Sequence, residues 1–274
     1  MLGSLRLPVA SCCEPHRRRP CPPQAGGRAP DRPALNILAT SAGFQPDGRY
    51  GLQVGPVVRH AIALSEASRP RLCLMHTATG DDAARYALAY AALARGCPQV
   101  QVSHLQLFPM PNVADPRAHL LSQDVVWVGG GSVVNLLAVW RAHGLAEVFR
   151  EAWEQGVVLA GGSAGSLCWH VGGTTDSFGP DLRPVTDGLA LLPFSNCPHY
   201  DSEGQRRPLY RELVGSGALP AGWASDDGVG LHFRGAQFAG AVSDRADAYA
   251  WRVDSAADGA LCETRVEPRR LEEG

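Results

Sequence analysis

The stretch Val157-Val158-Leu159-Ala160-Gly161-Gly162-Ser163-Ala164-Gly165 decides the fold of this chain. Its first four residues form a short apolar run, which predicts a buried strand. The five residues that follow match G-x-S-x-G, a pattern that joins a strand to a helix through a sharp turn. Small neighbours let the backbone bend there, so the serine is held in a strained position and its hydroxyl projects above the sheet.

Strands and helices alternate on both sides of this stretch. Apolar runs predict further strands, and helical periodicity predicts helices between them. The predicted strands are Leu35–Thr40, Arg71–His76, Val100–Leu105 and Asp124–Val128, and the predicted helices span 53–66, 81–95, 133–143 and 145–154. Such alternation predicts an α/β fold, a doubly wound and mostly parallel sheet with helices on both faces. Near the C-terminus, Val229–Phe233 and Gln237–Val242 read as a β-hairpin.

Composition divides the chain into three parts. Residues 1–33 contain seven of the 21 prolines and six arginines against two acids, which predicts a disordered tail. Residues 34–255 are expected to form a single catalytic domain, and residues 256–274 a C-terminal tail. With 45% apolar and 19% charged residues, the chain can bury a sizeable core.

Charge and cysteine content exclude several classes of function. The formal net charge of −2 gives no nucleic-acid footprint, and no apolar run reaches the length of a membrane-spanning helix. All 25 basic residues are arginine, which excludes lysine chemistry such as that of a P-loop. The eight cysteines form no CxxC pair, and no secretory signal is evident. We expect a cytoplasmic protein with no cofactor, no membrane and no nucleic-acid partner; its oligomeric state is open.

Ser163 is the candidate nucleophile, and it needs a base to take its proton. Among nine histidines, His199 follows a strand-like run, Leu189–Phe194, and the Cys197-Pro198 turn, which would bring it to a sheet end. His170 is expected on the helix that follows Ser163, pointing elsewhere. A metal site formed by His199, Asp201 and Glu203 is an alternative, because these alternate residues would share one face of an extended segment. No further ligand cluster supports that site, so we predict no metal.

An acid must orient the base. Asp176 is the leading candidate, but spacing alone does not select it. Four other acids remain open: Asp201, Glu203, Asp226 and Asp227.

An ordered set of motifs resembles the peptidase E (aspartyl dipeptidase) family. The motifs are Leu38–Phe44, Val128–Ser132, Gly162–Ser166, Thr174–Ser177, Asn196–Tyr200 and Asp226–Gly228, and the resemblance covers about residues 35–253. That family is a serine-nucleophile branch of the class I glutamine amidotransferase-like superfamily, which also contains cyanophycinase. The resemblance implies a doubly wound parallel sheet and cleavage of peptides after an N-terminal aspartate.

The resemblance also implies roles for single residues. Ser163 matches the family nucleophile and His199 the base, while Asp176 falls where one branch has its acid. Other branches are described with a glutamate as the acid, so the resemblance leaves the acid open. Gly130 and Gly131 match the loop that forms the oxyanion hole with the N–H of Ala164. Ser132 and Val133 stand where the family often has Asn-Thr.

The resemblance also implies that Arg206 recognises the aspartate of the substrate. Arg206 stands five residues before Arg211-Glu212-Leu213, as the matching arginine does in the family. A guanidinium fork pairs a carboxylate in two places, so the role is physically reasonable. A helix-surface arginine is the alternative, and the adjacent Arg207 is a rival.

Three functions compete on these grounds. The first is a serine peptidase that acts on short peptides through an acyl-enzyme. The second is another serine hydrolase, cyanophycinase-like or an esterase, although esterase folds place their histidine near the C-terminus and His199 precedes 75 further residues. The third is a relative that binds peptides without cleaving them. The presence of a serine, a histidine and candidate acids argues against this third function. A glutaminase is disfavoured because Ser163 stands where that chemistry needs cysteine.

Overall fold

A computed structural model describes residues 34–255 and 260–272 of the chain. The predicted tail at 1–33 lies outside the described residues and stays a prediction, as does the part of the predicted C-terminal tail at 256–259 and 273–274. The described part contains no helix long and apolar enough to cross a membrane.

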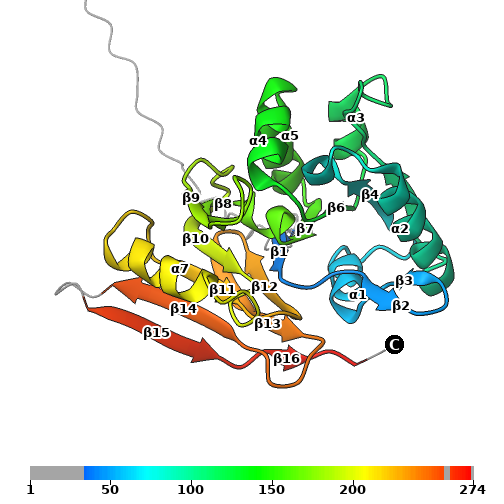
Figure 1. The fold of residues 1–274 in the computed structure, drawn as a ribbon. Coiled ribbons are helices and arrows are strands. Elements are labelled where there is room, and N and C mark those ends of the chain that lie inside the picture. The colour runs from blue at the N-terminus through cyan, green and yellow to red at the C-terminus, as the bar shows by residue number, and fades with distance from the viewer. Residues whose placement is uncertain (1–33, 256–259, 273–274) are drawn as a thin grey trace, which may run out of the picture. The chain divides into compact units, whose positions relative to one another are not determined.

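The larger sheet has eight strands, and the five consecutive strands at one end of its order run parallel. Figure 1 shows how these strands lie among the helices. In sheet order they are β16 (Arg269–Arg270), β13 (Gln237–Ser243), β12 (Val229–Arg234), β1 (Asn36–Thr40), β7 (Val158–Gly162), β6 (Val125–Val128), β4 (Arg71–Met75) and β5 (Gln101–His104). β1, β7, β6, β4 and β5 run parallel, and the hairpin β12–β13 adds antiparallel to β1. The predicted fold class and C-terminal hairpin are therefore confirmed.

Helices cover both faces of this sheet, and two neighbouring residues of β1 are buried on opposite faces. Leu38 packs with α1 (Pro56–Ala63) and α2 (Ala83–Gly96), whereas Ile37 belongs to the core on the opposite face. That second core includes α4 (Val133–Ala142), α5 (Leu145–Glu154), part of α3 (Pro116–Leu121) and the short α6 (Ala164–Leu167). Successive side chains of a strand point to opposite faces of the sheet, so a strand that is apolar throughout needs helices on both faces. Ile37 and Leu38 are each fully buried, which contributes roughly 1.5–3 kcal/mol per side chain.

Polar side chains cap the N-termini of α2 and α4, two of the predicted helices. Asp82 caps α2 by accepting the Ala84 N–H at 2.8 Å, and Ser132 caps α4 by accepting the Asn135 N–H at 3.2 Å. Asp81 has another role: its carboxylate accepts the N–H groups of Leu107 and Phe108 and the hydroxyl of Tyr86. Two small elements remain in the N-terminal half of the described chain. They are the single-turn η1 (Thr77–Thr79) and a two-stranded sheet of β2 (Gln45–Asp47) and β3 (Gly51–Gln53).

A second, six-stranded sheet was not predicted, although the strand-like run Leu189–Phe194 overlaps one of its strands. Its order is β15 (Leu261–Val266), β14 (Ala250–Ser255), β11 (Gly222–Ser225), β10 (Leu192–Pro198), β8 (His170–Thr175) and β9 (Arg183–Val185). α7 (Arg206–Gly215) packs on it through Tyr210 and Val214. Two expectations are corrected here. His170 begins strand β8 rather than continuing a helix, and part of the predicted tail forms strands, Leu261–Val266 and Arg269–Arg270.

The two sheets meet beside Ser163. Ser41, at the carboxyl end of β1, donates its hydroxyl to the carbonyl of Ser225 at the end of β11 (3.1 Å) and accepts the N–H of His199 (3.0 Å). In the first sheet β7 lies between β1 and β6, so the carboxyl ends of all three strands surround the residue that follows β7. Open parallel sheets bind ligands at this edge.

Candidate functional site

Ser163 has a backbone conformation that serine rarely adopts. It lies between β7 and α6 with φ 57° and ψ −112°, outside the regions favoured by L-residues. Such a conformation costs on the order of 1–3 kcal/mol and persists only where the surroundings fix it. Here the Ser163 N–H donates to the Thr40 carbonyl at 2.9 Å, and its own carbonyl accepts the N–H groups of Ser166 and Leu167. The predicted strand, tight turn and helix are therefore present.

Glycines allow this turn to pack tightly. A Cβ at Gly165 would lie 2.2 Å from the Val128 carbonyl oxygen, and one at Gly161 would lie 2.5 Å from the same atom. Both distances are well inside van der Waals contact. The glycines of the motif thus hold α6 against β6, which keeps Ser163 at the sheet edge.

His199 and Asp227 form the site's hydrogen-bonded pair. His199 directly follows β10 and Asp227 lies two residues after β11, and these strands pair in parallel with Pro198 beside Ser225. The His199 Nδ1 and Asp227 Oδ1 atoms are 2.6 Å apart. Both side chains are partly open to solvent, with exposed fractions of 23% and 34%. Adjacent parallel strands thus bring together residues that stand 28 positions apart.

The chemistry of this pair fixes which ring nitrogen is free. The hydrogen bond with His199, more than any other contact, lowers the pKa of Asp227, so this carboxyl is ionised at neutral pH. An ionised carboxylate only accepts hydrogen bonds, so His199 donates through Nδ1–H. Its Nε2 is then unprotonated in the neutral ring and can accept a proton.

Ser163, His199 and Asp227 line one cavity of about 430 Å³, together with Gly130, Gly162 and the loop from Ser41 to Pro46. Among the described residues, no hydrogen bond joins the Ser163 hydroxyl to His199. Catalytic hydrogen bonds often tighten only when substrate binds. The cavity therefore contains the hydroxyl of Ser163, whose backbone is strained, and the His199 ring, whose Nδ1–H is bonded to the ionised carboxylate of Asp227.

The expectation that Asp176 stands behind the base is corrected by this geometry. The Asp176 side chain is 60% exposed, and its ion pair is with Arg206 at 3.9 Å. The sequence left Asp227 open as an alternative, and its place after a strand that pairs with β10 is the feature that selects it. No local spacing reveals that pairing.

The other three candidate acids have structural partners. Asp226 is buried, accepts the Tyr249 N–H and the Trp251 indole N–H, and has its pKa raised by burial. Asp201 accepts the Asp227 N–H at 2.7 Å and so supports the loop that carries Asp227. Glu203 pairs with Arg206 rather than with His199. In the described ranges no group of three or more His, Cys, Asp or Glu residues could hold a metal ion.

The residues predicted to form the oxyanion hole differ in how closely they approach Ser163. A Cβ at Gly130 would come within 3.1 Å of the Ser163 Cβ, so this glycine borders the serine directly. Ala164 is the first residue of α6, where helix N–H groups lack intrahelical partners. Gly131 has φ 139° and packs against the Ala78 carbonyl, which a Cβ would approach to 2.4 Å. Gly130 and Ala164 are thus the better-placed pair.

Arg206 does not face this cavity, which corrects the expectation for it. Its side chain is 3% exposed and donates to Glu203 Oε2 at 2.8 Å and to the Thr174 carbonyl at 2.6 Å. These bonds tie the first turn of α7 to β8. Arg207 pairs with Glu263 and stacks on Trp251 instead. Neither arginine lines the cavity at Ser163.

Known peptidases resemble this chain in sequence and in fold. Residues 37–240 match the profile of peptidase family S51. The "Uncharacterized peptidase YgaJ" of Bacillus subtilis (strain 168) is 42% identical over 192 residues, covering 69% of this chain and 80% of that protein. "Peptidase E" of Shewanella amazonensis is 38% identical over 88 residues, 32% of this chain and 37% of that protein. A solved peptidase from an acI-B1 Actinobacterium shares the fold, with a TM-score of 0.60 at 14% identity over 86% of this chain and 96% of that one.

Proposed function

Because this chain belongs to peptidase family S51, we propose that it is a serine peptidase that hydrolyses short peptides through an acyl-enzyme. The observation that carries the proposal is the arrangement in one cavity of a strained Ser163 and a His199–Asp227 pair. Nucleophile, base and orienting acid are the three parts that acyl transfer needs.

Acylation uses these groups in sequence. The Ser163 hydroxyl oxygen attacks the peptide carbonyl carbon while its proton moves to His199 Nε2. Asp227 stabilises the imidazolium that forms, and the N–H groups of Gly130 and Ala164 bind the oxyanion. The C–N bond then breaks, and the imidazolium gives its proton to the leaving amine.

Deacylation repeats these steps with water. His199 takes a proton from a water molecule, whose oxygen attacks the ester carbonyl carbon. The bond to the Ser163 oxygen breaks, and the serine recovers its proton from His199. The products are a free carboxylic acid and the unchanged enzyme. Each step moves a proton over one hydrogen bond, so no cofactor is required.

A preference for an N-terminal aspartate needs a cation at this cavity. Arg206 does not supply it, since its guanidinium is buried against Glu203 and Thr174. Any acidic preference would therefore depend on another arginine near Ser163.

Hydrolysis of a dipeptide panel tests the proposal. Asp-Leu, Glu-Leu, Asn-Leu and Ala-Leu would be incubated with the parent chain and with Ser163→Ala, and free leucine measured. We expect at least one dipeptide to be cleaved by the parent and a loss of about 1,000-fold or more in Ser163→Ala, because the variant lacks the hydroxyl that forms the acyl bond. Activity of the variant within tenfold of the parent would reject Ser163 as nucleophile. Cleavage of p-nitrophenyl acetate without cleavage of any dipeptide would favour the esterase alternative.

A further inference from the structure

A second cavity adjoins the one that contains Ser163. It has a volume of about 220 Å³ and shares Ala42, Gly43, Phe44, Gly130 and Gly162 with the first. Neither His199 nor Asp227 lines it. The second cavity therefore opens from the Gly130 side of the serine.

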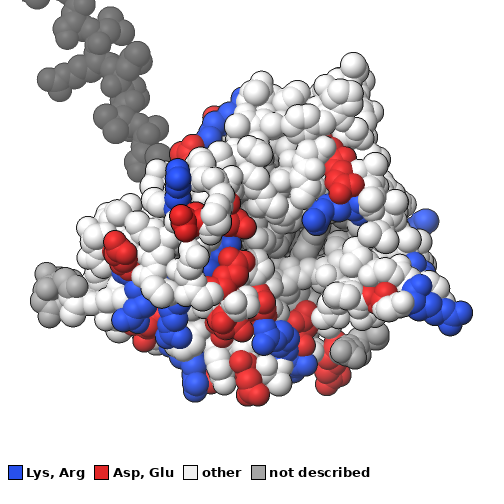
Figure 2. Space-filling model, in the orientation of Figure 1, with Lys and Arg blue, Asp and Glu red and all other residues white. Residues whose placement is uncertain are grey.

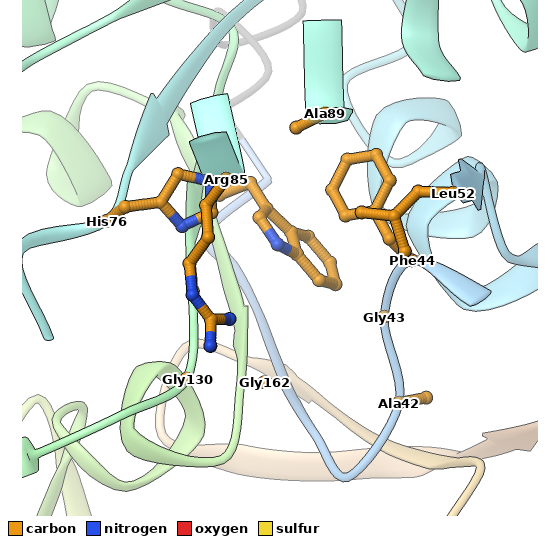
Figure 3. A pocket seen from close by; sticks show the side chains of 11 residues that line it. Ala42, Gly43, Phe44, Leu52, His76, Arg85, Ala89, Gly130 and Gly162 are labelled. Carbon is orange, nitrogen blue, oxygen red and sulfur yellow. The ribbon is translucent and has the colours of Figure 1, made fainter. Parts of the chain in front are cut away.

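The walls of this cavity divide into two kinds (Figure 3). Phe44, Leu52, Ala89 and Trp127 form an apolar part, in which the Phe44 and Trp127 rings meet edge to face at 6.2 Å. His76 and Arg85 supply the polar part, and the Arg85 guanidinium points toward Gly130 and Gly162 in Figure 3. Ligand pockets commonly combine apolar walls with a few polar groups that fix orientation.

Arg85 has a guanidinium that is open to a new partner. It lies in the first turn of α2 with 55% of its side chain exposed. Over residues 34–255 and 260–272 it makes no hydrogen bond, and its ion pair is a 4.0 Å contact with Asp82 in the same turn. The other arginine near Ser163, Arg245, is already bound to Asp201 and to the Asp227 carbonyl. Arg85 is thus the cation near Ser163 that has its donors available.

His76 gives an independent sign that a ligand is expected here. It is 6% exposed, and within the described part of the chain neither ring nitrogen has a hydrogen-bond partner. Burial, and then the charge of Arg85, lower the pKa of His76 to about 4, so the ring is neutral and carries one N–H donor. Gly129 leaves room for the ring, since a Cβ there would lie 2.4 Å from Nδ1. Buried polar side chains are normally hydrogen-bonded, and a bound ligand would supply the partner that is missing.

The reaction geometry assigns this cavity to one part of the substrate, if the proposed function holds. His199 must protonate the leaving amine, so the leaving residue lies in the cavity that contains His199. The cavity beyond Gly130 is on the oxyanion side of Ser163. It therefore faces the residue whose carbonyl is attacked, the N-terminal residue of a dipeptide.

We propose that the cavity lined by Arg85, His76 and Trp127 binds the side chain of that N-terminal residue and selects a carboxylate carried on at least two methylenes, glutamate rather than aspartate. Arg85 pairs with the carboxylate and His76 donates one hydrogen bond to it. The apolar wall of Phe44, Leu52, Ala89 and Trp127 packs against the methylenes. One extra buried methylene is worth about fourfold in affinity.

Binding to a chain that cannot turn over tests the pocket without relying on catalysis. Dissociation constants of Glu-Leu, Gln-Leu and Asp-Leu would be measured by calorimetry with Ser163→Ala in the full chain. The same titrations would use two double variants, Ser163→Ala with Arg85→Gln and Ser163→Ala with Arg69→Gln. Arg69 is an exposed arginine outside the cavity and controls for the loss of one positive charge.

We expect Glu-Leu to bind about tenfold or more tightly than Gln-Leu, and about fourfold more tightly than Asp-Leu. Arg85→Gln should weaken Glu-Leu about tenfold and change Gln-Leu by no more than about twofold, because only the charged pair is removed. Arg69→Gln should leave all three constants within about twofold.

Other results would overturn the assignment. Equal losses for Glu-Leu and Gln-Leu, no loss in Arg85→Gln, tighter binding of Asp-Leu than of Glu-Leu, or no binding at all would each do so. Hydrolysis by the parent chain separates this inference from the proposed function. A glutamate preference in binding without hydrolysis of any dipeptide would reject the peptidase and keep the pocket, whereas hydrolysis that ignores Arg85 would keep the peptidase and reject the pocket.

Discussion

Replacing Asp227 with asparagine should disable the base while leaving the fold in place. The amide keeps the volume of the side chain, and the backbone contacts of Asp227 with Asp201 and Arg245 do not involve the carboxylate. What is lost is a charge-assisted hydrogen bond of 2.6 Å to His199. Such a bond is worth roughly 1.5–3 kcal/mol, or about 10- to 150-fold in rate.

A second effect acts in the same direction. An asparagine amide can donate to His199 Nδ1, which would move the ring proton to Nε2 and stop it from accepting the Ser163 proton. Solvent reaches both side chains of the pair and weakens the purely Coulombic part of the lost bond. Because the change of tautomer adds to that loss, we take the upper end of the range for the two effects together. We therefore expect kcat/KM to fall about 100-fold or more at pH 7.5, with Tm within about 3 °C of the parent.

The assay is steady-state hydrolysis of whichever dipeptide the parent cleaves best, with Asp176→Asn as the matched control. Asp176 is exposed and pairs with Arg206 at 3.9 Å, so its amide variant should keep kcat/KM within about threefold. A fall for Asp227→Asn of less than tenfold, or an equal fall in both variants, would refute the assignment of Asp227 as the orienting acid.

Three further changes test the fold around the site. Burial lowers the pKa of His170 to about 4 from about 6.5 in the unfolded chain, so its contribution to stability is present above pH 6.5 and is lost as the pH falls toward 4. Urea unfolding at pH 7 and pH 4.5 should show His170→Gln losing less stability on acidification than the parent does, by up to about 3 kcal/mol. Gly165→Ala would place a Cβ 2.2 Å from a carbonyl oxygen and should cost about 3 kcal/mol or prevent folding, whereas Gly204→Ala, with open space around it, should change Tm little. Arg206→Gln should lower the free energy of unfolding by about 1–3 kcal/mol in chemical denaturation, with the ratio of Asp-Leu to Ala-Leu hydrolysis unchanged.

The sequence was sufficient to predict every strand of the larger sheet except β16, because the signals of these strands are local. Apolar runs mark β1, β4, β6 and β7, and helical periodicity over 81–95 marks α2. The same holds for Ser163, whose turn follows from small residues next to one another in the chain.

Apart from the strand-like run Leu189–Phe194, which overlaps β10, the second sheet escaped prediction because its strands have weak local patterns. β8 contains Gly172 and Gly173, which read as loop signals. In the fold they allow close strand packing, since a Cβ at Gly173 would lie 1.8 Å from the Asn196 carbonyl oxygen. Tertiary packing overrides the propensity of such residues.

The partner of His199 and the position of Arg206 could not be predicted, because both depend on contacts between distant segments. Asp227 stands behind His199 only because β10 and β11 are parallel neighbours, and no spacing within either segment encodes that pairing. Arg206 has the sequence context of a helix-surface residue, yet Glu203 and Thr174 hold it inside. Arg85 and His76 lie far from the recognised motifs, and the cavity that they share is visible only in three dimensions.

Covalent labelling of Ser163 tests the central claim most directly. The full chain would be treated with a fluorophosphonate and analysed by intact mass and peptide mapping, in parallel with Ser163→Ala and Asp227→Asn. We predict one adduct on Ser163 in the parent, none in Ser163→Ala and markedly slower labelling in Asp227→Asn, because the reagent reacts with an activated serine hydroxyl. An unlabelled parent, or an adduct on another serine such as Ser166, would contradict the account.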